Sequence, residues 1–119
     1  MKERDQKTEK VISQLKMTLV TMPPNDPSLR QGYLLLGQAE ASLGHDADAA
    51  AAWRKALDIE FAPDLAAQVA EEQVRAEGHI SADSLDLYRR ALDAAPQDAP
   101  WPQALQQRIA QGEHDQEQP

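Results

Sequence analysis

The sequence predicts an all-α protein built from helical hairpins, and three observations indicate that class. A hexapeptide made of an aromatic residue, two basic residues, Ala, Leu and Asp occurs twice, starting at Trp53 and at Tyr88. In each copy the aromatic residue, the Ala and the Leu fall at i, i+3 and i+4, on one face of a helix. The spacing between the copies is close to the 34-residue period of helix-turn-helix repeats. No alternating run of Val, Ile and Thr bounded by turn residues, which would indicate a strand, occurs in the sequence.

The segment around the first copy follows the tetratricopeptide repeat pattern. That pattern has an aromatic residue, a Leu-Gly pair three residues later, and a small residue four positions before a second aromatic residue. The matching positions are Tyr33, Leu36, Gly37, Ala49, Trp53, Ala56 and Leu57. Small residues are needed because a larger side chain would push the two helices apart. Glu40 stands where the pattern expects an aromatic residue, so either the packing there is altered or its carboxylate reaches solvent.

The second copy matches the pattern mainly in its second half, where the fitting positions are Ser84, Tyr88, Ala91, Leu92 and Pro96. The preceding segment 64–77 is helical in composition but lacks an aromatic residue and a Leu-Gly pair, so its register is left open. The one residue beyond a strict period of 34 is expected in the turn 78–81, because a loop tolerates an insertion and a packed helix does not.

We expect six helices, separated by Pro-rich breaks at 23–27 and 96–102 and by short turns. Their expected ranges are 5–21, 28–43, 46–59, 64–77, 81–94 and 103–111. Repeats at about 28–61 and 63–96, with the closing helix 103–111, are expected to form one domain over 8–111. The predicted architecture is a short right-handed superhelical stack with N- and C-terminal flanking helices. The start 1–7 and the polar tail 112–119 are expected to be disordered.

Charge and composition restrict the function. The net charge of −8, with twelve basic residues scattered among twenty acidic ones, argues against binding to nucleic acid or to a membrane surface. The absence of Cys excludes disulfides and thiol nucleophiles. No apolar stretch approaches the ~18 residues of a spanning helix, and the polar start lacks the apolar stretch of a signal peptide. The chain as given is therefore expected to be soluble.

The order of motifs resembles one particular tetratricopeptide domain. An amphipathic helix is followed by Pro24-Asn-Asp-Pro, Tyr33-Leu-Leu-Leu-Gly, the two hexapeptides and, between them, Ala62-Pro-Asp-Leu-Ala. This order is similar, over roughly Thr8 to Ala95, to the domain of the CcmI-like subunit family of cytochrome c maturation. The resemblance implies a periplasmic domain, tethered by membrane helices, that holds the C-terminal helix of apocytochrome c for haem attachment. This chain lacks the membrane segments and a further full repeat, so it is either an excised domain or a protein of another kind, which would be cytoplasmic.

In stacked hairpins the first helix of each repeat lines a concave groove, and residues one turn apart on that face are the expected peptide contacts. In the first repeat these are Gln31, Leu34, Gln38, Ala41 and Ser42. In the second repeat the expected counterparts are Ala66, Val69, Gln73 and Ala76. Leu34 would fill an apolar pocket, while Gln31 and Gln38 would satisfy polar groups. The alternative reading is that Gln and Ala occur on any solvated helix face.

We expect no enzyme activity, cofactor or metal, because the sequence has no Gly-rich phosphate loop or Ser-His-Asp arrangement and no spacing places two His on one helical face. Trp53 and Tyr88 are expected in the core. Trp101, between two prolines, either covers the end of the stack or anchors a partner. Three functions follow: a peptide-binding scaffold of the cytochrome maturation type, a general adaptor in another assembly, or self-association through the first helix or the Trp101 end.

Overall fold

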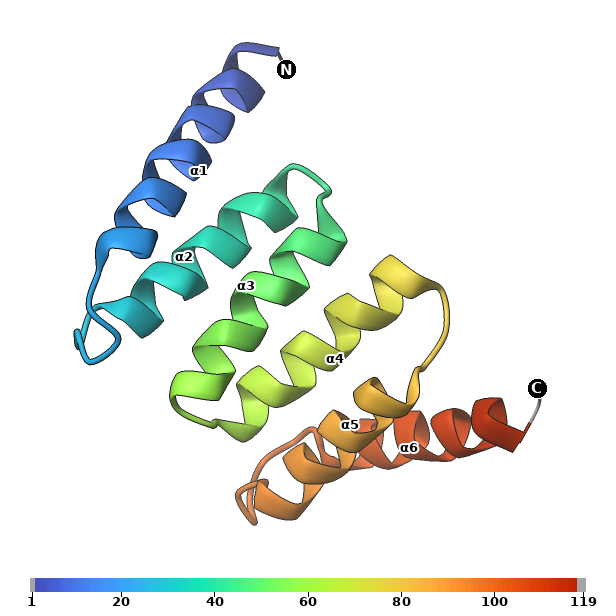
Figure 1. Cartoon of the computed structure of the whole chain (residues 1–119). Helices are drawn as coiled ribbons and strands as arrows, with labels where there is room; N and C mark the ends of the chain where they lie inside the picture. The colour runs from blue at the N-terminus through green and yellow to red at the C-terminus, as the bar shows by residue number, and fades with distance from the viewer. Residues whose placement is uncertain (1, 118–119) are drawn as a thin grey trace. The chain divides into compact units, whose positions relative to one another are not determined.

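The computed structural model describes residues 2–117, with side chains from Asp5 onward. Six α-helices follow one another in this part of the chain, which contains no strand (Figure 1). They are α1 (Lys2–Thr21), α2 (Leu29–Ser42), α3 (Asp46–Ile59), α4 (Pro63–Glu77), α5 (Ala82–Ala94) and α6 (Pro102–Glu117). The predicted all-α class is confirmed.

The helices belong to two compact units, which divide between Glu60 and Phe61. In the first unit α2 and α3 form an antiparallel hairpin and α1 packs on α2. In the second unit α4 and α5 form the hairpin and α6 packs on α5. The two hairpins and the two flanking helices are those predicted from the sequence. Their stacking into a right-handed superhelix within one domain stays a prediction.

The core of the first unit lies where α1 meets α2. Ile12 and Leu19, two turns apart on α1, are buried in one cluster with Leu29, Leu36 and Ala52. With the partly buried Leu15, these two residues form the apolar face by which α1 packs on α2. Other apolar side chains of α1 remain exposed, including those of Met17 and Val20.

Within the first hairpin, Gly37 allows a close approach of the helices. A Cβ atom at Gly37 would clash with the rigid indole ring of Trp53 at Nε1. Trp53 is buried, and its indole N–H donates to the carbonyl oxygen of Leu34 at 3.2 Å. Ala49 and Ala56 are fully buried. The repeat pattern in this segment therefore describes the contacts that close the hairpin.

The two hairpin turns differ in length as predicted. Residues 43–45 join α2 to α3, whereas residues 78–81 join α4 to α5. The second turn is longer by one residue, and this is the residue in excess of a 34-residue period. Gly44 and Gly78 both take positive φ angles, of 77° and 80°, which L-amino acids with a side chain rarely adopt.

Both chain ends differ from the expectation of disorder over 1–7 and 112–119. The structure continues α1 back to Lys2 and α6 on to Glu117, while residues 1, 118 and 119 lie outside the described residues. The start of α1 is rich in Lys, Glu, Arg and Gln, which are good helix formers without being apolar.

The extension of α6 beyond Gln111 has a packing cause. Gly112 is buried, and a Cβ there would lie 2.9 Å from both Ile80 and Leu85. Two polar contacts beyond it also tie α6 to the unit: Glu113 pairs with Arg89 at 3.0 Å, and the Gln116 amide donates to the Ile80 carbonyl at 3.2 Å. Gly112 is therefore a contact residue within the helix and not a helix end.

Candidate functional site

The second unit contains a cleft of about 540 Å³ between α4 and α6. Its apolar lining comes from Ala67, Trp101, Ala104 and Leu105. Its polar lining comes from Asp64, Gln68, Glu71, Gln107, Arg108 and Gln111. Trp101 therefore lines this cleft and is only partly buried, whereas Leu105 is buried in the unit.

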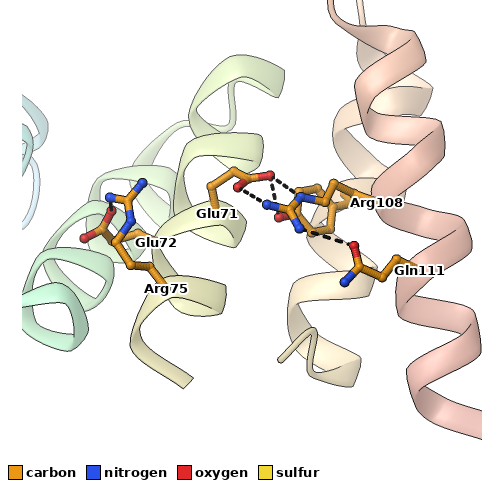
Figure 2. Close-up of polar contacts among 6 residues, drawn as sticks. Glu71, Glu72, Arg75, Arg108 and Gln111 are labelled. Atoms are coloured by element: carbon orange, nitrogen blue, oxygen red, sulfur yellow. Dashed lines mark hydrogen bonds and ion pairs between the residues drawn. The ribbon is translucent and has the colours of Figure 1, made fainter. Parts of the chain in front are cut away.

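An ion pair joins the two walls of the cleft. The Arg108 guanidinium on α6 donates to both carboxylate oxygens of Glu71 on α4, through Nε and Nη2, at 2.8 Å each (Figure 2). The Tyr88 hydroxyl on α5 donates to the same carboxylate at 2.8 Å, and Arg108 also donates to the side chain of Gln111 at 3.4 Å. A bidentate Arg–carboxylate contact of this kind fixes orientation as well as distance. Glu71 thus connects all three helices of the unit.

These contacts shift the three titrating groups. Partial burial acts to raise the pKa of Glu71, but the hydrogen bonds from Arg108 and Tyr88 outweigh it and hold that pKa below its usual value. Burial and the bond to Glu71 raise the pKa of Tyr88, and the bond to Glu71 raises the pKa of Arg108. All three groups are therefore held in their ordinary neutral-pH forms, with Glu71 and Arg108 charged and Tyr88 neutral.

The lowered pKa of Glu71 predicts a small acid-dependent loss of stability. The ionised Glu71 carboxylate stabilises the folded state above its unfolded-state pKa near 4.5. This stabilisation is lost as pH falls through the lower folded-state pKa of Glu71. Because the side chains of Glu71 and Arg108 are 42% and 34% exposed, we expect about 1 kcal/mol or less. Thermal unfolding at pH 7 and pH 3 should show a smaller acid-induced loss in Glu71→Gln than in wild type. Arg108→Gln should resemble Glu71→Gln, and equal losses in all three proteins would contradict this role for the ion pair.

Glu71 occupies the place in the second hairpin that Gly37 occupies in the first. Gly37 precedes its contact Trp53 by sixteen residues, and Glu71 precedes its contact Tyr88 by seventeen, the difference being the longer turn. The first hairpin needs a glycine beside the indole, whereas the second accommodates a carboxylate that accepts a bond from a phenol. A position that closes one hairpin therefore supplies a charged group to a cleft in the other.

This equivalence places each residue of α4 34 positions after its counterpart on α2. The groove positions expected on α4 lie 35 positions after those on α2, so they differ from this register by one residue. Ala66 and Val69 were expected to contact a peptide, but both are fully buried and their side chains cannot reach one. Gln73 is bound to α5: its amide donates to Asp83 at 3.1 Å and its oxygen accepts from Ser84 at 2.8 Å. Ala76 is exposed, but it is not among the residues that line the cleft.

The residues of α4 that do line the cleft were missed by the sequence analysis. They are Asp64, Ala67, Gln68 and Glu71. With the extra residue in the turn, α4 lies 34 positions from α2, so Gln68 is the counterpart of Leu34. Because the extra residue was expected in the turn 78–81, after α4, an offset of 34 between α2 and α4 would have given this register. Nothing in the sequence indicated that Arg108 and Trp101 would face these residues.

The expected contacts on α2 are accessible. Gln31, Gln38 and Ser42 are exposed, while Leu34 and Ala41 are partly buried. Gln38 and Ser42 also line a groove of about 600 Å³ between α1 and α2, with Val11, Gln14, Leu15, Thr18, Leu35 and Ala39. The structure brings these two residues together in one groove, and the other three of the five are not part of its lining.

Glu40, the exception to the repeat pattern, is buried but paired. Its carboxylate lies 3.3 Å from the Lys16 ammonium of α1 and 2.7 Å from Nδ1 of His45. Packing at this position is therefore altered, as one of the two sequence readings required. Glu40, His45 and Asp48 also place one oxygen or nitrogen each within 4.8 Å of one another. Lys16 already compensates the buried charge, so this group is explained without a ligand.

The features above define an all-α protein of helical hairpins with a cleft between α4 and α6 in its second unit. No family model, curated protein or solved structure matches the chain in comparisons with known proteins. Among the described residues, no helix has the length and apolar character that crossing a membrane requires.

Proposed function

We propose that the chain is a non-enzymatic scaffold that binds a peptide segment of another protein, in the manner of a tetratricopeptide repeat domain. The observation that carries the proposal is the α4/α6 cleft, whose apolar surface is flanked by glutamine side chains from both walls. Ligand sites of this kind combine apolar contact area with a few polar groups that fix orientation. Gln68, Gln107 and Gln111 supply amide donors and acceptors for a peptide backbone.

The accessible face of α2 supports the same function in the first unit. Gln31 and Gln38 are exposed on either side of Leu34, which is partly exposed. An apolar side chain between two amides suits the apolar face of a bound helix. Both leading helices of the hairpins therefore carry surfaces suited to peptide.

The resemblance to the CcmI-like family suggests a partner. On that basis we propose that the bound segment is the C-terminal helix of an apocytochrome c, held for haem attachment together with the haem-ligation subunits, in the periplasm. The same fold in a cytoplasmic adaptor of another assembly is the alternative. Binding to a synthetic apocytochrome c C-terminal peptide separates the two, because a general adaptor would ignore that peptide.

Leu34→Glu tests this function. We expect the substitution to weaken binding of the apocytochrome peptide about tenfold, because it places a charge where an apolar side chain would dock. Fluorescence anisotropy with labelled peptide measures the affinity, and circular dichroism checks that the protein remains folded. Ala51→Glu, at an exposed position of α3, adds the same charge and should leave binding unchanged. Wild-type protein that fails to bind the peptide at high micromolar concentration would exclude the apocytochrome proposal.

Self-association is a second candidate, favoured by the outward apolar side chains of α1. Met17 is 71% exposed and Val20 is 83% exposed, and both lie on a helix whose other face packs on α2. Light scattering over a range of concentrations distinguishes this candidate, because a monomer at every concentration excludes it.

A further inference from the structure

We propose that the α4/α6 cleft is a binding site for a cationic peptide segment that carries a bulky apolar side chain. The inference rests on the proposed peptide-binding function and specifies both the site and the chemistry of its ligand. It follows from the charge of the second unit, the state of its arginines and the lining of the cleft.

The negative charge of the chain is concentrated in the unit that contains the cleft. Residues 61–119 hold eleven acidic residues against four arginines and no lysine, a net charge of −7. Residues 1–60 hold nine acidic and eight basic residues, a net charge of −1, and the two values give the −8 of the whole chain. A strongly acidic surface attracts a cationic partner and speeds its association.

The four arginines of this unit all have partners within it. Arg75 pairs with Glu72 at 2.9 Å, Arg89 with Glu113 at 3.0 Å, and Arg108 with Glu71 at 2.8 Å. The guanidinium of Arg90 lies over the Phe61 ring, 4.9 Å from its centre. None of these cations is an isolated positive charge that would oppose a basic ligand.

The net charge of the cleft lining is negative, like that of the whole unit. Arg108 and Glu71 neutralise each other, so the remaining charged lining residue, Asp64, makes the lining net negative. Asp64 is exposed at the first turn of α4. A Lys or Arg of a bound segment can pair with this carboxylate.

The apolar part of the lining requires a matching group on the ligand. Trp101, Ala104 and Ala67 present partly buried or exposed surface beside the buried Leu105. Aromatic side chains at such positions supply a large share of binding energy. A Leu, Met or Phe side chain on the bound segment would bury this surface, while a basic residue of the segment pairs with Asp64. A peptide with only the apolar side chain, or only the basic residues, would gain only part of the binding free energy.

The test uses two labelled amphipathic helical peptides of about 16 residues, with the same Leu face and with either Lys or Glu on the polar face. The full chain should bind the Lys peptide at least tenfold more tightly than the Glu peptide, and added salt should reduce the difference. Ala104→Lys, at an exposed position in the cleft, should weaken Lys-peptide binding about tenfold. Ala110→Lys, at an exposed position of α6 outside the lining, makes the same change of charge and should have little effect.

Two results would overturn the inference while leaving the proposed function intact. One is equal loss of binding in Ala104→Lys and Ala110→Lys, which would show that net charge alone attracts the peptide. The other is binding of the apocytochrome peptide, sensitive to Leu34→Glu, by protein that ignores the Lys peptide. Self-association that is lost in Ala104→Lys and kept in Ala110→Lys would also overturn it, by assigning the cleft to a second copy of the chain.

Discussion

Trp53→Ala is expected to lower the free energy of unfolding by about 3–5 kcal/mol. The indole is buried in the α2/α3 hairpin, contacts Gly37 closely and donates its N–H to the Leu34 carbonyl. Truncation leaves a cavity beside a glycine that has no side chain to fill it. Because a unit of this size has a small core and is only marginally stable, one large buried side chain supplies a large share of its stability.

Chemical unfolding followed by circular dichroism measures this loss. Trp53→Phe keeps an aromatic ring but removes the N–H donor, so it should cost less than Trp53→Ala. A loss below about 1 kcal/mol in Trp53→Ala would contradict the packing described for the first hairpin, because that value is typical of a surface position.

Trp101→Ala is expected to affect binding and not stability: binding of the Lys peptide should weaken by about 30-fold, with little change in the free energy of unfolding. A central aromatic residue of a binding site commonly contributes about 2 kcal/mol or more, which is about this ratio. Trp101 lines the α4/α6 cleft at the start of α6 and is only partly buried. Anisotropy titration and thermal unfolding of the same preparation measure the two quantities.

Loss of stability comparable to that of Trp53→Ala, with affinity unchanged in the folded fraction, would assign Trp101 to covering the end of the unit. That was the other reading of this residue from the sequence. The two tryptophans of the chain therefore form a matched pair for separating packing from binding.

The hairpins could be predicted because their contacts are local. Trp53, Gly37 and Ala49 lie within one repeat, so helical spacing alone places them on facing surfaces. The same applies to the longer turn at 78–81, whose place follows from the spacing of the two hexapeptides. Glu40 shows the limit of this reasoning: the pattern identified it as an exception, but its partner Lys16 comes from another helix.

The cleft could not be predicted because it depends on contacts between distant segments. Arg108 reaches Glu71 across 37 residues, and no periodicity relates them. The groove positions expected on α4 depended on its register, and an error of one residue moved Ala66 and Val69 from an expected surface into the interior. Similarly, the last helix was expected to end before Gly112, because the packing of Gly112 against Ile80 and Leu85 is not visible in the local sequence.

The most direct test of peptide binding in the cleft is an NMR titration of ¹⁵N-labelled protein with the Lys peptide, observing the two indole N–H signals. The Trp101 signal is expected to shift as peptide fills the cleft, while the buried Trp53 signal, bonded to the Leu34 carbonyl, stays in place. A shift of Trp53 alone, or of neither signal at saturating peptide, would contradict the account.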